Sequence, residues 1–579
     1  MRVAVAAGAG GSALLCELRE DGSPRDGLVH VNDLSTAVAD YELAGPVRWV
    51  WASGVGLYPS LLQAGQRVAR CHDVELAERL LLGRDGQVGG FASSLPPDRA
   101  ARGTAQETLF DPADAAPPDL TGTLDALIAA HADQLRRIAA DDHPARFGML
   151  VAAESAGGLV AAEMSFAGLP WRTDVHDSLL AGLLGPRPPA VPAGGRPPRL
   201  AELAARIDEA FGGRRVNPDS PAQLIRAFAA DGVRVPSTRF SVLRDVDHPA
   251  APLLIEYKEL ARMHAAHGWA WMDSWVSGGR FRPEYVVGGV VSGRWASRGG
   301  GALQIPKVLR RAVVADPGWA LVVADAAQLE PRVLAALAGD RAFAEAAASG
   351  DLYLALAGVF GGDRAKAKIA LLSAMYGGAG GEAGQLLSVL RQRFPLASRY
   401  VEAAARAGQE GHVVRSVLGR TCPPPSAAWR AITEESGDPD SERDPGAGAA
   451  SRARGRFTRN FVVQASAADW ALVLLAGLRR RLALISLPDG DSGARLTPQA
   501  SVPPQASVPP VAGVTRMAGP HLVFFQHDEV IVHCPESLVE PVVAAIGEAG
   551  EEAGRLVFGA TPVRFPLTTA VVSCYGDAK

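Results

Sequence analysis

The feature that most constrains the fold is a pair of mostly apolar segments, far apart in the sequence, that each lead to a carboxylate. Residues 319–324 form a strand-like run that ends at Asp325, and residues 521–525 form another that leads to Asp528 and Glu529. The end of a rigid strand is a place where a fold can hold a metal ligand, although an aspartate there is more often a turn former. The pair therefore indicates a site only if the intervening residues can handle phosphate.

A helical pattern between the two segments meets that condition. Arg364, Lys368, Leu372 and Tyr376 recur every four residues, and two glycines follow as a helix stop. At about 100° per residue, Arg364 and Lys368 share one helix face, where their like charges repel slightly. A bound polyphosphate would offset that repulsion through charge-assisted hydrogen bonds. The alternative interpretation is an ordinary solvated helix face.

Composition excludes several classes of protein. The formal net charge of −4 rules out a uniformly basic nucleic-acid coat, but it leaves a local basic cleft possible. The five cysteines are widely spaced and form no CxxC pair, so we expect neither a disulfide framework nor a structural zinc site. The apolar run at 470–478 is far short of the roughly 20 residues that span a bilayer. We therefore expect a protein of a reducing compartment that has no membrane segment.

Three segments resemble motifs of the A-family DNA polymerases, the bacterial polymerase I group. Residues 325–332 resemble the first palm motif of that family, residues 364–377 its finger helix, and residues 526–529 its closing motif. Lesser signatures occur at 293–306 and 456–469, in the same order as in the family. The combination specifically resembles the actinobacterial type, a bifunctional 3′→5′ exonuclease and DNA polymerase without a 5′-nuclease domain.

The resemblance implies an α+β multidomain fold. It predicts an RNase H-like, exonuclease-like α/β domain at the N-terminus, followed by a right-hand polymerase with a helical thumb, an antiparallel-sheet palm and helical fingers. The expected ranges are 1–150 for the exonuclease-like domain, 151–290 for the thumb and 291–579 for the palm and fingers, with the fingers at about 340–455. Disordered insertions are expected near 433–455 and near 487–519, where a Pro-rich hexapeptide occurs twice in tandem.

The activity implied by the resemblance is template-directed DNA synthesis. Deoxynucleotides would be added to a primer 3′-hydroxyl by two-metal phosphoryl transfer, with release of pyrophosphate. Asp325, Asp528 and the main-chain carbonyl of Ala326 would hold two Mg²⁺ ions, for which Mn²⁺ can substitute, and Glu529 would support them. The expected partners are primer-template DNA and dNTPs, and the protein is expected to be monomeric, cytoplasmic and nucleoid-associated.

The resemblance also assigns residues to the nucleotide and to the DNA. Arg364 and Lys368 would hold the triphosphate, and Lys368 would protonate the leaving pyrophosphate. Glu330, with Tyr376 beside it, would exclude a 2′-hydroxyl. The remaining expected contacts are Gln328 and Leu372 to the nucleotide, and Arg294, Gln304, Arg456, Asn460, Gln464 and His527 to primer or template.

Several positions depart from the family pattern. Leu372 stands where an aromatic residue usually stacks on the incoming base, and Tyr353 replaces a phosphate-contacting histidine. The first strand has no acidic residue and Leu57 occupies an expected aspartate position, so that Asp73 and Asp133 are the only partial matches to the exonuclease acids. We therefore expect proofreading to be inactive. The alternatives are a DNA-binding scaffold with weakened catalysis, an active proofreading exonuclease and a single-subunit RNA polymerase, which Glu330 disfavours.

Overall fold

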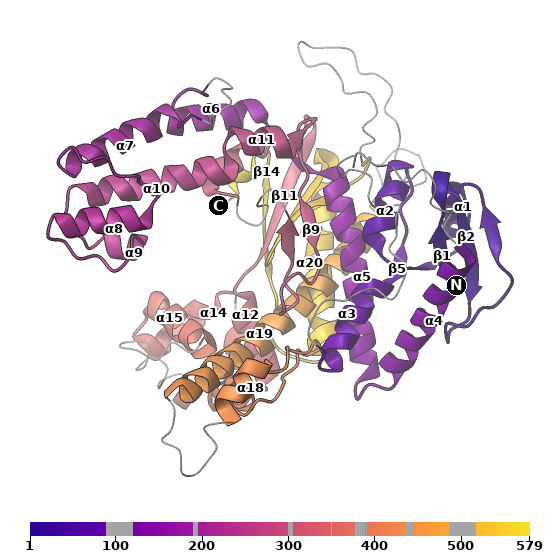
Figure 1. The fold of residues 1–579 in the computed structure, drawn as a ribbon. Helices are drawn as coiled ribbons and strands as arrows, with labels where there is room; N and C mark the ends of the chain where they lie inside the picture. Colours follow the sequence, from indigo (N-terminus) through magenta and orange to yellow (C-terminus); the bar gives the residue numbers. More distant parts are fainter. Residues whose placement is uncertain are drawn as a thin grey trace. The chain divides into compact units, whose positions relative to one another are not determined.

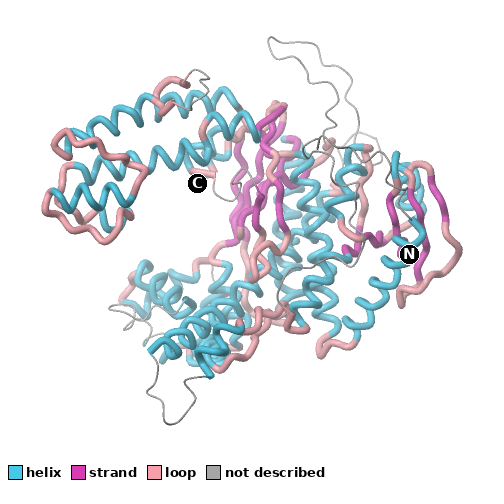
Figure 2. Tube along the Cα trace, in the orientation of Figure 1, coloured by secondary structure: helices cyan, strands magenta, loops and turns pink. Residues whose placement is uncertain are grey.

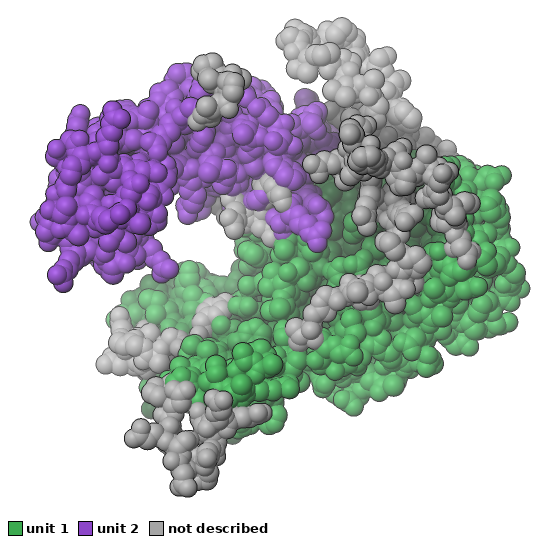
Figure 3. Space-filling view, viewed as in Figure 1, with its two compact units in different colours: residues 1–167, 285–296, 322–571 green, residues 168–284, 297–321, 572–579 purple. Residues whose placement is uncertain are grey.

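The computed structural model describes residues 1–87, 120–188, 195–298, 301, 305–348, 350–376, 388, 391–434, 445–485 and 517–578. Helices predominate over sheets, which confirms the expected α+β class (Figure 1, Figure 2). The chain forms two compact units, shown in Figure 3. The first unit comprises residues 1–167, 285–296 and 322–571, and the second comprises residues 168–284, 297–321 and 572–579.

The first unit begins with a five-stranded sheet in the order β3-β2-β1-β4-β5. β1 and β3 run antiparallel to β2, whereas β4 runs parallel to β1 and to β5. Alternate residues of β1 enter two hydrophobic clusters, Val3 and Val5 one of them and Ala4 and Ala6 the other, so both faces of this strand are buried. The strands are β1 Arg2–Ala7, β2 Ala13–Leu18, β3 Val29–Val31, β4 Arg48–Trp51 and β5 Arg70–Asp73, and the accompanying helices are α1 Leu34–Ala44, α2 Gly54–Gln63, α3 Val74–Arg84 and α4 Leu120–Ala139.

Helix α5, Pro144–Ala167, connects this sheet to the rest of the first unit. It contacts α2 and β5 on one side and the long helix α19, Pro445–Leu482, on another (Figure 1). The expected domain boundary at residue 150 therefore falls inside a continuous helix, and the second unit starts only at residue 168. Periodicity does not reveal this continuity, because α5 is buried on more than one side and lacks a single apolar stripe.

A four-stranded sheet lies elsewhere in the first unit, in the order β12-β13-β11-β14. β12 and β13 form an antiparallel hairpin in which Gln526 pairs with Glu529. In this sheet β11 lies directly beside β13, although most helices of the unit separate the two strands in the sequence. The strands are β11 Trp319–Ala326, β12 His521–Gln526, β13 Glu529–Pro535 and β14 Leu567–Val572, and α20, Val539–Phe558, packs against α19.

Seven helices lie between β11 and β12 in the described part of the chain. They are α12 Leu329–Ala338, α13 Arg341–Ala347, α14 Leu352–Ala357, α15 Arg364–Tyr376, α17 Pro395–Gln409, α18 Ala427–Glu434 and α19. The insertion expected near 433–455 is wrong for residues 445–455, which form the first three turns of α19. Proline is compatible with a first helical turn, and the alanines and arginines that follow favour helix despite three glycines. Residues 435–444, and most of the insertion expected near 487–519, lie outside the described residues.

The second unit is mainly helical. Its helices are α6 Thr173–Leu184, α7 Pro198–Ala210, α8 Pro221–Ala230, α9 Phe240–Leu243, α10 Ala250–His267 and α11 Trp269–Trp275, and its small sheet has the order β6-β8-β7, with β6 Leu169–Pro170, β7 Val276–Ser277 and β8 Arg280–Phe281. Helix α8 has the start that its sequence favours, since the Ser220 side chain accepts a hydrogen bond from the amide of Gln223 and Pro221 is the first helical residue. Trp171, Trp271 and Phe281 form an aromatic core near α11.

Two helices are long and apolar enough to cross a membrane by length and composition. In these spans, within Pro144–Ala167 and Gly446–Leu482, 67% and 83% of the residues are buried inside the protein. Core helices of a globular protein have this property, so the two helices give only weak support for a membrane location.

Candidate active site

The structure brings Asp325 and Asp528 side by side. Asp325 is the last residue but one of β11, and Asp528 lies in the turn between β12 and β13. The amide of Ala326 donates a hydrogen bond of 2.9 Å to the carbonyl oxygen of Asp528, which joins the two chain segments at these residues. Both aspartates are half-buried, whereas Glu529 is buried. Two aspartates from remote parts of the sequence are therefore neighbours at one end of the four-stranded sheet, where β11 ends and the β12–β13 turn lies.

Unusual backbone conformations flank this pair. Gln328 and His527 both have φ of 57°, and among the described non-glycine residues no others have a positive φ. His527 directly precedes Asp528, and Gln328 follows Asp325 by three residues. Left-handed conformations cost side-chain-bearing residues about 1–3 kcal/mol and tend to cluster where function requires a fixed geometry. Gln328 and His527 therefore indicate that the backbone next to Asp325 and Asp528 is held in an unfavourable conformation by its surroundings.

An ion pair between Arg294 and Glu330 lies close to the same turn. Arg294 donates to Glu330, which sits in the first turn of α12, where a carboxylate also interacts favourably with the helix dipole. Burial lowers the pKa of His527, and the positive charge of Arg294 lowers it further, so that Arg294 is near His527 as well. These three predicted site residues are therefore assembled from three separate segments of the chain.

A second cluster of polar side chains surrounds Asp351, a residue for which the sequence predicted no role. The side chain of Gln328 donates to Asp351 (2.7 Å) and accepts from the amide of Leu352 (2.8 Å). Arg364 donates to Asp351 (2.8 Å), and its guanidinium lies 5.4 Å from the centre of the Tyr353 ring. Burial acts to raise the pKa of Asp351, but the hydrogen bonds, led by that of Arg364, outweigh it and lower the pKa to about 2. Asp351 thus fixes the first residue of α15.

Helix α15 presents its cations as the spacing predicted. Arg364 and Lys368 are exposed, whereas Ala367, Ala370 and Leu371 are buried against the protein. Leu372 is half-buried at the edge of the exposed face. Two other predicted positions cannot be placed in the same way, because Gln304 and the side chain of Tyr376 lie outside the described residues.

The predicted DNA-contacting residues of α19 form a stripe on that helix. Arg456 is exposed, and Asn460 and Gln464 are half-buried, whereas Phe461 and Ala465, which follow Asn460 and Gln464 directly, are buried. A spacing of four residues places the three polar side chains along one side of the helix. The arrangement is suited to a partner that runs along α19.

Sequence reasoning also missed the role of Arg332, which the first motif contains. Its side chain is fully buried and donates to four main-chain carbonyls, those of Ala327, Ala347, Gly350 and Arg564. The guanidinium thereby ties the turn after β11 to two loops on either side. A buried arginine in a segment of otherwise apolar helix was the available signal, but its partners are distant in sequence and could not be inferred.

The oxygen donors at the strand ends suit Mg²⁺. Aspartate carboxylates and a main-chain carbonyl are hard ligands, and Mg²⁺ retains several waters, so a small protein donor set suffices. Asp325, Asp528 and the carbonyl of Ala326 provide such a set at one point of the sheet. Among the described residues, no cluster of three or more His, Cys, Asp or Glu side chains has the arrangement of a metal site.

The acidic residues that partly match the exonuclease pattern, Asp73 and Asp133, are bound to other groups of the protein. Asp73 is buried at the end of β5, where its two carboxylate oxygens accept from the amides of Gly54 (2.7 Å) and Leu76 (3.0 Å). Burial raises its pKa to about 6. Asp133 pairs with Arg136 at the surface, and Leu57 is buried in α2.

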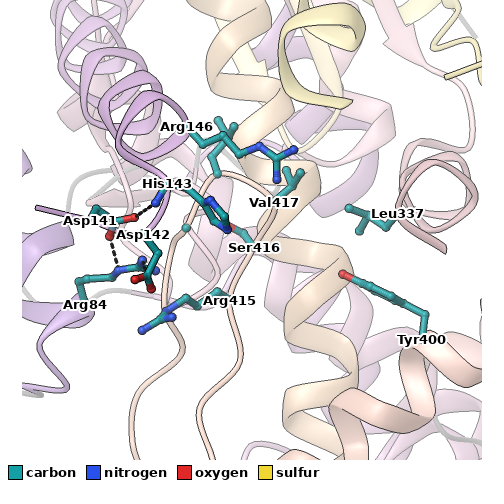
Figure 4. A pocket seen from close by; sticks show the side chains of 12 residues that line it. Arg84, Asp141, Asp142, His143, Arg146, Leu337, Tyr400, Arg415, Ser416 and Val417 are labelled. Carbon is teal, nitrogen blue, oxygen red and sulfur yellow. Dashed lines mark hydrogen bonds and ion pairs between the residues drawn. The ribbon is translucent and has the colours of Figure 1, made fainter. Parts of the chain in front are cut away.

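Two clefts are present in the first unit away from the strand-end aspartates. One, of about 460 Å³, is lined by the glycine-rich residues 8–12, by Leu57 and by Asp33, whose carboxylate caps α1. The other, of about 350 Å³, lies between the start of α5 and residues 415–419 (Figure 4). Arg84 lines this cleft, and its guanidinium forms an ion pair of 2.5 Å with Asp141.

Known proteins resemble the chain over most of its length. The family model described as DNA polymerase family A matches residues 197–571. DNA polymerase I of Chloroflexus aurantiacus is 25% identical over 386 residues, covering 59% of this chain and 36% of that protein. The thermostable DNA polymerase I of Thermus thermophilus is 25% identical over 404 residues, covering 61% and 42%. The chain thus matches well under half the length of these relatives.

A solved structure is similar over the whole chain. The POL domain of Pol1 from M. smegmatis, in complex with DNA primer-template and dNTP, superposes with a TM-score of 0.66 at 18% identity. The match covers 100% of this chain and 95% of that one, which shows a common fold.

Proposed function

Because the chain belongs to DNA polymerase family A, we propose that it is a DNA-directed DNA polymerase. It would extend a primer 3′-hydroxyl with deoxynucleotides under the direction of a template and release pyrophosphate. The observation that carries this proposal is the hydrogen bond between Ala326 and Asp528, which places two remote aspartates at a single sheet edge.

Asp325, Asp528 and the carbonyl of Ala326 are the proposed ligands of Mg²⁺. When bound, the cations supply Lewis-acid stabilisation of the charge that develops during phosphoryl transfer. Buried Glu529 follows Asp528 directly and supports the turn. Since the end of β11 is hydrogen-bonded to the β12–β13 turn at these residues, the main chain that carries the two aspartates is fixed at the strand ends.

Arg364 and Lys368 are the proposed ligands of the triphosphate. Their exposure on one face of α15 supports this role, and Lys368 would donate a proton to the leaving pyrophosphate. Arg364 is held by Asp351 in this structure, so a nucleotide would compete with or share that contact. Gln328 and Leu372 would border the same nucleotide, with Tyr376 at the end of the helix.

Glu330 is the proposed gate against ribonucleotides, and Arg294 fixes its position through the ion pair. His527, Arg456, Asn460 and Gln464, together with Arg294 and Gln304, are the proposed contacts to primer and template. Contacts of this kind to phosphate and minor-groove edges position a duplex without selecting its sequence, which a copying enzyme requires. The solved relative was captured with DNA primer-template and dNTP, which supports these partners.

The N-terminal sheet is the proposed remnant of an RNase H-like exonuclease domain. Its strand order, with an antiparallel β1–β3 meander followed by parallel β4 and β5, supports that origin. A two-metal exonuclease needs clustered carboxylates. Asp73 is committed to main-chain amides and Asp133 to a surface arginine, so we propose that proofreading is inactive.

One assay tests the proposed activity and its alternatives. A primed template is incubated with the protein, Mg²⁺ and either dNTPs or rNTPs, and both lengthening and shortening of the primer are followed. Lengthening with dNTPs alone supports the proposal. Duplex binding without lengthening would instead indicate a DNA-binding scaffold, equal use of rNTPs an RNA polymerase, and shortening that survives Asp325→Ala an active exonuclease.

A further inference from the structure

A buried ionic cluster joins the N-terminal part of the first unit to the segment that carries Arg294. Arg420 donates to Glu154 of α5 (2.7 Å) and to Asp469 of α19 (3.2 Å). The three residues are 7%, 3% and 0% exposed, so the cluster is shielded from water. Removing one member of such a group leaves an uncompensated buried charge, which makes the position of Arg420 strongly dependent on Glu154.

Arg420 belongs to a short hairpin that is itself fixed in place. The amide of Cys422 donates to the carbonyl of Val414 (3.0 Å), and the amide of Arg420 donates to the hydroxyl of Ser416 (2.8 Å). The amide of Val417 donates to the hydroxyl of Ser466 on α19 (3.0 Å). Residues 415–419 of this hairpin line the 350 Å³ cleft of Figure 4. The guanidinium therefore has little freedom to move unless its carboxylate partners change.

The ionic cluster packs closely against Gly288 and Gly293, shortly before Arg294 in the sequence. A Cβ atom at Gly293 would clash with Nε of Arg420, and one at Gly288 would lie 2.5 Å from Oε1 of Glu154. Both glycines have positive φ, 82° and 60°. The chain closes into a turn here, because the amide of Gly293 donates to the carbonyl of Val290 (2.8 Å). The cluster thus forms the surface on which this turn rests.

Arg294 emerges from that turn toward the proposed active site, where it pairs with Glu330. We propose that Glu154, acting through Arg420 and the Gly293 turn, is a positioning residue for the Arg294–Glu330 pair, and so for discrimination between deoxyribonucleotides and ribonucleotides. This inference rests on the proposed polymerase function. It gives the N-terminal part of the chain a role in synthesis although its own exonuclease acids are missing.

Helix α5 contains a matched control, Glu163. It is also buried, and it accepts hydrogen bonds from Arg479 (2.7 Å) and Arg67 (2.7 Å). Glu163→Gln therefore removes a buried charge from the same helix at a comparable cost in stability. In contrast to Glu154, Glu163 is paired with Arg479 on α19 and with Arg67 in the N-terminal sheet region, not with the Arg420 that contacts the Gly293 turn.

The test compares full-length Glu154→Gln and Glu163→Gln in thermal unfolding and in single-nucleotide extension with dNTP and with rNTP. Both variants should unfold at lower temperature than the wild type. Only Glu154→Gln should change the ratio of kcat/KM for dNTP to that for rNTP, by roughly three- to thirtyfold, the range of coupling through packed networks. Gly293→Ala, which displaces Arg420 while Glu154 is intact, should change the ratio in the same direction. Equal ratios in all variants and the wild type would overturn the inference.

A second measurement does not depend on activity. In a double-mutant cycle of urea unfolding, Glu154→Gln and Glu330→Gln should be non-additive, whereas Glu163→Gln and Glu330→Gln should be additive. Additivity in both cycles would overturn the inference. A wild-type chain that fails to extend any primer would contradict the proposed function instead, and the cycle would still decide whether Glu154 and Glu330 are coupled.

Discussion

The two sheets of the first unit use the carboxylates at their strand ends in opposite ways. In the four-stranded sheet, Asp325 and Asp528 stand half-buried on neighbouring segments joined by a main-chain hydrogen bond. In the five-stranded sheet, Asp73 also ends a strand, but it is buried and both its oxygens accept from amides of helix starts.

The difference shows that the position of an acid in the sequence does not decide its role. A carboxylate whose two oxygens each accept from a main-chain amide stabilises the helix starts that donate to it, and those hydrogen bonds use part of its acceptor capacity. Asp325 and Asp528 are neighbours at the strand ends, and a divalent cation bound between them would relieve the repulsion of their charges. The four-stranded sheet therefore fits a metal-dependent site, and the five-stranded sheet fits a structural one.

The largest expected effect separates these two sites directly. Asp528→Ala should reduce primer extension by about 10³-fold or more, because the metal contributes several kcal/mol of transition-state stabilisation. Duplex affinity should remain nearly unchanged, as measured by fluorescence anisotropy. Asp73→Ala should leave the extension rate within about twofold of the wild type at a temperature where it is folded. Comparable losses in both variants would remove the distinction between the sheets.

The next effect concerns the cationic helix that accompanies only the four-stranded sheet. Lys368→Ala should slow single-turnover incorporation by about 10²- to 10⁴-fold, the usual contribution of a general acid. Lys366→Ala is the matched control, since two residues along a helix turn the side chain by about 200° away from Lys368. Equal rates for the two variants would refute the assignment of Lys368.

A smaller effect is expected at Leu372, the least typical position of the proposed nucleotide site. Leu372→Phe should tighten nucleotide binding by about 5- to 150-fold, because base stacking contributes roughly 1–3 kcal/mol. The acceptance of chain-terminating nucleotides should change in parallel. Ile369→Phe, at an exposed position of the same helix, serves as the control. Without any difference between the two variants, Leu372 would not line the pocket.

The smallest effect is a pH dependence of stability that belongs to the five-stranded sheet. Burial raises the pKa of Asp73 from 3.8 to about 6, so the folded protein retains a proton that the unfolded chain has lost. The contribution of Asp73 to stability is therefore present below pH 4 and is lost as pH rises through 6. The difference in unfolding free energy between the wild type and Asp73→Asn should fall between pH 4 and pH 7. A constant difference would show that Asp73 titrates normally.

Local patterns in the sequence predicted the elements better than their partners. The exposed face of α15 and the cap of α8 follow from residues a few positions apart, so spacing and capping rules suffice. Helix α19 was partly misinterpreted because glycines and mixed charges at its start resemble a loop. The contacts of Asp351, Arg332 and Glu154 were not predictable, because each depends on groups that only the folded chain brings together.

The central claim, that Asp325 and Asp528 together hold the catalytic cations, is tested most directly by counting bound metal. Mn²⁺ binding would be measured by electron paramagnetic resonance for the protein with a chain-terminated primed template and the matching dNTP. The wild type is predicted to bind two more Mn²⁺ ions than the DNA and nucleotide alone, and the double variant Asp325→Asn/Asp528→Asn is predicted to lose both. An equal number of bound ions in the two proteins would contradict the claim.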